Sequence, residues 1–191
     1  MHDLHELGIE QHATEAGVLA LNERVAFHEA GHAVAAFHHG LKVRRVSIKP
    51  DAEAQGYCLL APSRRHFDMP LSLRVRHAFE SHFVVAFAGP LSELRHRDGS
   101  PDDLWEIGRT DDHAELEESV LEIIGNQPEA DAYLQWLRVR TEQFLADIDV
   151  WQQVEVVAFT LLKWREIDGG PLKEAMQQAM GANFVARRRW G

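Results

Sequence analysis

Residues 24 to 39 read Arg-Val-Ala-Phe-His-Glu-Ala-Gly-His-Ala-Val-Ala-Ala-Phe-His-His, and this stretch decides how the rest of the chain is arranged. At its centre, His28 and His32 flank Glu29 with a spacing of four residues. In a helix, that spacing places the two imidazoles one turn apart on the same face, where both can bind one metal ion. Zinc prefers neutral imidazole ligands in a tetrahedral shell. Glu29 lies one step around the helix, so it can reach metal-activated water without binding the metal itself.

The residues around this motif are typical of a buried helix. Apolar and small side chains surround it, among them Val25, Phe27, Ala30, Ala33, Val34 and Phe37. We predict a helix from about residue 23 to 39, capped by Asn22 at its start and ended by Gly40. Gly31 lowers helix propensity, which indicates that another backbone or the metal site approaches closely there. A buried histidine pair beside a carboxylate needs polar partners, and a metal ion supplies them.

Metal binding is not the only interpretation of the histidines in this stretch. With 12 histidines in 191 residues, the motif itself can arise by coincidence. His38 and His39 are interpreted as helix-terminus residues and not as ligands, because helical spacing turns them away from the motif.

The composition favours one soluble globular domain over residues 1–191, with a polar lead-in at 1–20 and a flexible tail at 181–191. The net charge of −10 argues against a nucleic-acid partner. The single Cys58 excludes an intrachain disulfide and a cysteine-based zinc site. No apolar run is long enough for a membrane segment, and no signal peptide is evident, so we expect a cytoplasmic protein.

The remaining pattern predicts a mainly α-helical domain with a small β-hairpin or sheet beside the motif helix. Residues 42–49 alternate apolar and polar positions, and residues 57–60 resume an extended pattern. This hairpin either binds an extended substrate along its edge or only covers the core. Residues 168–171 predict a turn. Further helices are predicted at about 71–94, with a kink or restart at Gly89-Pro90, and at 110–125, 129–147, 149–166 and 172–180.

Five stretches, in order, resemble the peptidase domain of the FtsH family, the membrane-anchored, ATP-dependent zinc metallopeptidases. Phe27 to Val34 resembles that family's zinc helix, and Val43 to Tyr57 resembles its strand and Gly-Tyr segment. Phe87 to Glu93 resembles its Gly-Gly-Arg-x-Ala-Glu helix, and Gly108 to Asp112 resembles its Gly-Ala-Ser-Asn-Asp turn. Val154 to Leu172 resembles its closing helix and Asp-Gly turn. The resemblance covers about residues 22–180 and implies a helical zincin-type metallopeptidase fold.

Carried over residue by residue, the resemblance implies His28 and His32 as zinc ligands and Glu29 as the general base. Glu93 matches the family's glutamate. It either accepts a hydrogen bond that orients a ligand histidine or is an ordinary acid on a helix surface.

The third zinc ligand would be an aspartate of the later turn, where this chain offers two. Asp112 fits the family pattern better than Asp111, because the apolar Leu116 follows it by four positions on the same helical face. Asp111 would place Glu115 there instead, and it is then a helix N-cap.

The departures from the family restrict the function. The sequence shows no phosphate-binding Gly-x-x-x-x-Gly-Lys-Ser/Thr loop and no membrane anchor, and Pro90 stands where the family has Gly or Arg. We therefore expect a zinc metallopeptidase that by itself cleaves flexible or unfolded polypeptides without ATP. The sequence leaves open whether a separate ATPase feeds it and whether it assembles as a homo-oligomer. The alternatives are a catalytically silent, zinc-stabilised binding or adaptor module and a zinc-free helical scaffold.

Overall fold

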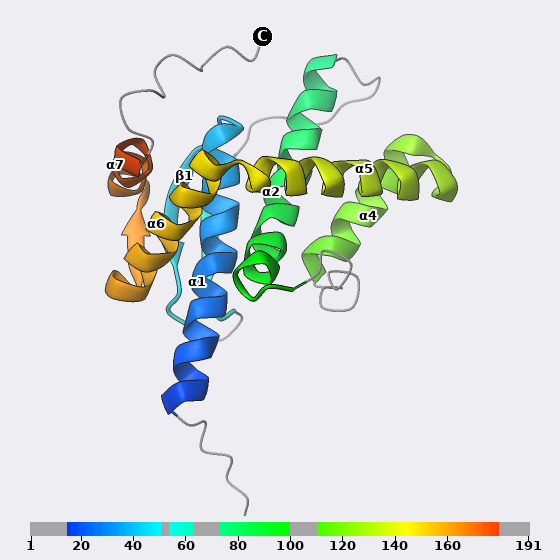
Figure 1. Ribbon diagram of the computed structural model, residues 1–191. Coiled ribbons are helices and arrows are strands. Elements are labelled where there is room, and N and C mark those ends of the chain that lie inside the picture. The colour runs from blue at the N-terminus through cyan, green and yellow to red at the C-terminus, as the bar shows by residue number, and fades with distance from the viewer. Residues whose placement is uncertain (1–14, 51–53, 63–72, 100–110, 180–191) are drawn as a thin grey trace, which may run out of the picture.

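The computed structural model describes residues 15–50, 54–62, 73–99 and 111–179, and its centre is a pair of long helices. Helix α1 (Glu15–His38) carries the histidine motif, and α2 (Leu73–His96) packs along it (Figure 1). Helix α1 begins earlier than the sequence pattern predicted, so Asn22 lies inside the helix and does not cap it. Helix α2 continues through Pro90 as one helix and does not restart there.

A small antiparallel sheet lies beside α1. Strands β1 (Val43–Ser47) and β2 (Tyr57–Leu60) form the predicted hairpin. A third strand, β3 (Glu166–Asp168), pairs with the other side of β1, which gives the order β2-β1-β3. The pattern predicted a helix and then a turn at these residues. The preceding helix instead ends before them, because Arg165 adopts a left-handed backbone with φ of 65° and its N–H bonds Leu161 O at 2.7 Å.

The remaining helices complete the core. Helix α4 (Asp111–Ile124) packs on α5 (Gln127–Ala146), α5 crosses α2, and α6 (Ile148–Trp164) packs on α1 (Figure 1). Helix α7 (Gly169–Ala179) packs on α6 and on the sheet. Side-chain caps set two of these starts: Asn126 accepts a hydrogen bond from Glu129 N at 3.1 Å, and Asp147 accepts one from Asp149 N at 2.8 Å. The expectation of a mainly helical fold with a small sheet is confirmed.

Aromatic packing fixes the motif helix at the centre of the molecule. Phe27, directly before His28, is 2% exposed. Its ring stacks on His96 of α2 at a centroid distance of 3.6 Å and on Trp151 of α6 at 5.9 Å. The motif is therefore held between two neighbouring helices. In the described parts of the chain, no helix has the length and apolarity that a membrane crossing requires.

Candidate metal centre

His28 and His32 lie side by side on α1. Their ring centroids are 4.8 Å apart, and their planes are inclined at 73°. A zinc ion bound at about 2.0–2.1 Å from each imidazole nitrogen would leave the two centroids about 5 Å apart. The observed separation is compatible with two ligands of one ion.

Both rings are held by acceptors on α2. His32 Nδ1 donates to the backbone oxygen of Val85 at 2.7 Å, and His28 Nδ1 lies 3.4 Å from Glu93 Oε2. Because a carbonyl or carboxylate oxygen can only accept, each Nδ1 carries the proton and each lone pair lies on Nε2. This is the tautomer of a zinc-binding histidine whose other nitrogen is fixed by an outer acceptor. The donor chemistry of the pair therefore fits zinc.

Glu93 is 8% exposed and lies at the centre of a charged network. Its Oε1 accepts from Arg24 Nε at 2.7 Å and from Arg97 Nη1 at 3.3 Å. Burial opposes ionisation of Glu93, but the hydrogen bonds from His28 and Arg24 and the Arg24 charge outweigh it and lower its pKa to about 2. Glu93 is therefore a buried carboxylate bonded to His28, and the interpretation as an ordinary surface acid does not fit its burial.

Two glycines allow α1 and α2 to approach each other at the histidine pair. A methyl group on Gly31 would lie 2.8 Å from the Ala88 carbonyl carbon and closer still to its oxygen. The close backbone approach predicted at Gly31 is confirmed. A methyl group on Gly89 would lie 2.5 and 2.7 Å from His32 Cε1 and Cδ2, and closer still to Nε2. These similar distances place Gly89 over the ring face, so Gly89 leaves the in-plane direction of the Nε2 lone pair open.

Glu29 lies beside the edge strand of the sheet. It is 6% exposed, and a methyl group on Gly56 would lie 3.1 Å from its Cγ. Burial and the nearby Glu29 charge raise the pKa of the Cys58 thiol on β2. Because β1 occupies the middle of the sheet, β2 has one unpaired main-chain edge within the described strands. The motif glutamate and the edge strand β2 are thus neighbours.

The structure leaves the third ligand open. Asp111 and Asp112 begin α4, but their side chains lie outside the described part of the molecule. Among the side chains that are described, no group of three or more His, Cys, Asp or Glu residues could hold a metal ion. The described donors are therefore the two histidines.

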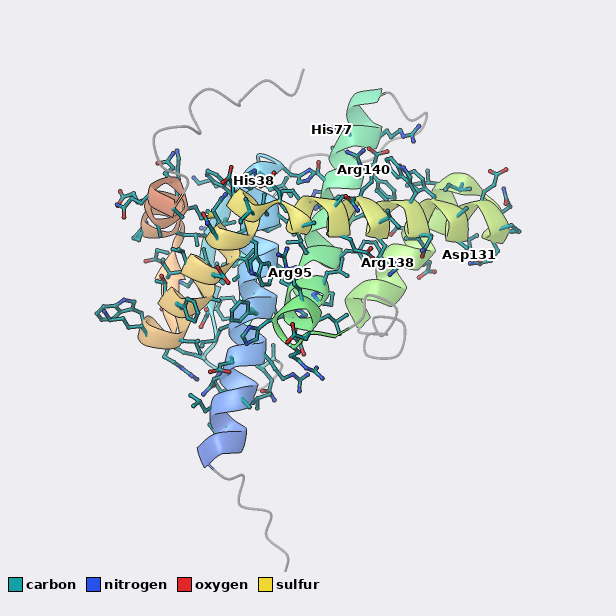
Figure 2. All side chains as sticks on the ribbon, viewed as in Figure 1. His38, His77, Arg95, Asp131, Arg138 and Arg140 are labelled. Carbon is teal, nitrogen blue, oxygen red and sulfur yellow. The ribbon has the colours of Figure 1, made fainter. Side chains whose placement is uncertain are left out.

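His38 and His39 lie at the opposite end of α1 from its N-terminus and bond other helices. His38 Nε2 donates to Gln153 Oε1 at 3.1 Å, and His39 Nδ1 lies 3.1 Å from Ser81 Oγ. His38, His77 and Arg140 all lie toward this end of α1 (Figure 2). Burial lowers the pKa of His38 and lowers that of His39 to about 4, with the charges of His77, His38 and Arg140 acting in the same direction on His39.

Sequence reasoning did not single out Arg24, Gly56 or Gly89 as parts of this site. A signal for Arg24 was present, because it precedes His28 by four residues and so lies on the same helical face. Its partner Glu93 is 69 residues away in the sequence, and only the packing of α2 on α1 brings the two together.

No known protein-family model matches the chain, and no curated protein gives a significant match. The functional interpretation therefore depends on the motif and on the geometry around it.

Proposed function

We propose that this chain is a zinc metallopeptidase that hydrolyses peptide bonds in flexible or unfolded polypeptides. One observation carries the proposal: two histidines one helical turn apart are both fixed through Nδ1 by acceptors on the neighbouring helix, and they flank a buried glutamate. With both Nδ1 atoms bonded in this way, both Nε2 lone pairs remain for a metal ion, which supports the proposal. The resemblance to the FtsH peptidase domain supports the same function.

His28 and His32 would hold the zinc ion through Nε2, and Asp112 is proposed as the third ligand from the resemblance. A zinc ion supplies Lewis-acid chemistry, since it polarises a peptide carbonyl and lowers the pKa of water to about 7. Asp112 lies at the start of α4.

Glu29 would move the proton. Its carboxylate takes a proton from the attacking water and delivers it to the leaving amine nitrogen of the cleaved peptide. Burial against Gly56 shields the carboxylate from bulk water, which strengthens its electrostatic interactions inside the site.

The unpaired edge of β2 would position the substrate. An extended polypeptide can add to a strand edge through main-chain hydrogen bonds, which recognise any sequence in extended form. Because Gly56 and Cys58 place this strand beside Glu29, a polypeptide on the edge passes the general base. Only segments without stable structure can adopt this conformation, which is why we propose flexible or unfolded substrates.

Hydrolysis of fluorescently labelled, unfolded casein by the purified, zinc-loaded protein tests the function. Glu29→Gln should retain zinc and lose about 10²–10⁴-fold in turnover, since it removes the general base. Glu23→Gln is the matched control on the same helix, because the Glu23 side chain is 45% exposed and its Oε2 lies 4.0 Å from His96 Nε2. Full turnover in Glu29→Gln would remove Glu29 from the mechanism. A wild-type protein that binds zinc and cleaves nothing would favour the adaptor module instead.

A further inference from the structure

One arginine connects the helix that carries the histidines to the carboxylate that bonds one of them. Arg24 precedes His28 by one helical turn and lies on the same face of α1. Its Nε donates to Glu93 Oε1 at 2.7 Å, while the other oxygen of the same carboxylate, Oε2, lies 3.4 Å from His28 Nδ1. Arg24, Glu93 and His28 thus form a relay of two hydrogen bonds across one carboxylate.

This arrangement divides the two oxygens of Glu93 between two tasks. Arg24 and Arg97 both donate to Oε1, which leaves Oε2 to face His28. The last side-chain torsion of a glutamate has a broad, roughly two-fold distribution. Without a partner, the carboxylate can therefore rotate away from the imidazole. A guanidinium on Oε1 fixes that rotation, because its N–H groups have a rigid, planar geometry.

Arg24 and Arg97 are not equivalent in this role. Arg97 lies four residues after Glu93 on the same helix and contacts it at the longer distance of 3.3 Å. Arg24 comes from α1, so it fixes the carboxylate relative to the helix that carries the histidines. Of these two arginines, Arg24 is therefore the one that fixes the Glu93 oxygens relative to the helix that carries His28.

We propose that Arg24 is a positioning residue of the metal centre, which acts through Glu93 to hold the His28 imidazole in its zinc-binding orientation. This inference rests on the proposed function, since it requires that His28 binds zinc. Arg24 does not touch the metal or the substrate in this role. Its effect should therefore appear in zinc affinity, and it should vanish when Glu93 can no longer transmit it.

The alternative is that Arg24 only joins α1 to α2. The Arg24 side chain is 45% exposed, and an ion pair with an exposed partner contributes little to stability. The close approach of the two helices at Gly31 does not involve Arg24. A purely structural contact would change the unfolding midpoint and would leave zinc affinity unchanged.

Zinc dissociation constants, measured by competition with a chromogenic chelator, separate the positioning role of Arg24 from a purely structural one. Four versions of the chain are compared. The four are wild type, Arg24→Gln, Glu93→Gln and the double variant. Loss of an outer partner of a ligand histidine typically weakens metal binding by about 10–100-fold, which we expect for Glu93→Gln. Arg24 is one bond further away, so we expect about 3–10-fold for Arg24→Gln. The double variant should bind zinc no more weakly than Glu93→Gln alone.

Arg76→Gln is the control, because Arg76 Nε donates to Glu80 Oε1 at 2.8 Å in an ion pair that joins the same atom types but lies within α2. Its zinc affinity should equal that of wild type. Arg24→Lys keeps the charge with fewer hydrogen-bond donors, so its zinc affinity should lie between those of wild type and Arg24→Gln. If Arg24→Gln does not fold, Arg24→Lys replaces it in the comparison.

Four results are decisive. An unchanged zinc affinity in the folded Arg24 variants would overturn the inference, as would a double variant whose loss is the product of the two single losses. A wild-type protein that binds no zinc after reconstitution would overturn the proposed function and the inference with it. The coupled loss of affinity with an unchanged unfolding midpoint would establish the positioning role.

Discussion

Replacing Gly89 by alanine tests whether the His32 ring must remain where the structure places it. The new methyl group would lie 2.5 and 2.7 Å from two ring carbons, whereas carbon atoms in contact prefer about 3.5–4.0 Å. The ring or the helix must therefore move by about 1 Å. The ring cannot move alone without disturbing the 2.7 Å hydrogen bond from His32 Nδ1 to Val85 O.

The structure predicts different effects of Gly89→Ala on stability and on metal binding. Overpacking costs about 1–3 kcal/mol, and the better helix propensity of alanine offsets about 1 kcal/mol of this, so the free energy of unfolding should fall by about 0–2 kcal/mol. Displacement of a ligand ring should weaken zinc binding by at least about 10-fold, as loss of an outer ligand partner does.

Urea unfolding of the metal-free protein and chelator competition measure the two effects separately. Gly170→Ala is the control, because beyond its chain neighbours and its own helix backbone a methyl group there meets no described atom within 4 Å, and it should leave zinc affinity unchanged. Zinc binding of Gly89→Ala equal to that of wild type would refute the reasoning, since a ligand ring would then tolerate the displacement that the packing imposes.

Three further predictions concern other parts of the molecule. Gly31→Ala places a methyl group against the backbone of Ala88, which cannot yield as a flexible side chain can. The free energy of unfolding in urea should therefore fall by about 2–3 kcal/mol. An unchanged unfolding midpoint would contradict this close approach. The pKa of His39 is about 4 in the folded protein and about 6.5 in the unfolded chain. Between these pH values the unfolded state binds more protons, so the free energy of unfolding falls as the pH drops from about 6.5 to 4. The fall should be about 1–2 kcal/mol after allowance for the partial exposure of His39. Unfolding curves of His39→Gln across that pH range should be correspondingly flatter, and an unchanged slope would exclude His39 as the cause. Asp112→Ala should lose zinc and Asp111→Ala should keep it; the reverse would make Asp111 the ligand.

The hydrophobic pattern was sufficient to predict the helical elements and the hairpin. Apolar residues at helical spacing identified the motif helix, and the alternation at residues 42–49 identified β1. The start of α1 was missed because Val18 and Leu19 are 46% and 59% exposed, so they show no buried face from which a helix could be predicted.

The contacts that shape the candidate site come from residues far apart in the sequence. Strand β3 has three residues, and its pairing with β1 joins segments about 120 residues apart, which no local pattern can indicate. The spacing of the motif is by itself enough to indicate His28, Glu29 and His32 as candidates. The acceptors of both histidine rings lie on α2, so their identity depends on how α2 crosses α1, and the sequence indicated only Glu93 among them through the family resemblance.

The most direct test of this account is the zinc content of the purified protein by elemental mass spectrometry, on wild type beside His28→Ala, His32→Ala and the control His38→Ala. We propose that His28 and His32 hold one ion through Nε2, whereas His38 bonds Gln153. We therefore expect about one zinc per chain in wild type and His38→Ala and none in the other two variants. Wild-type protein without zinc after reconstitution, or zinc retained in both His28→Ala and His32→Ala, would contradict the account.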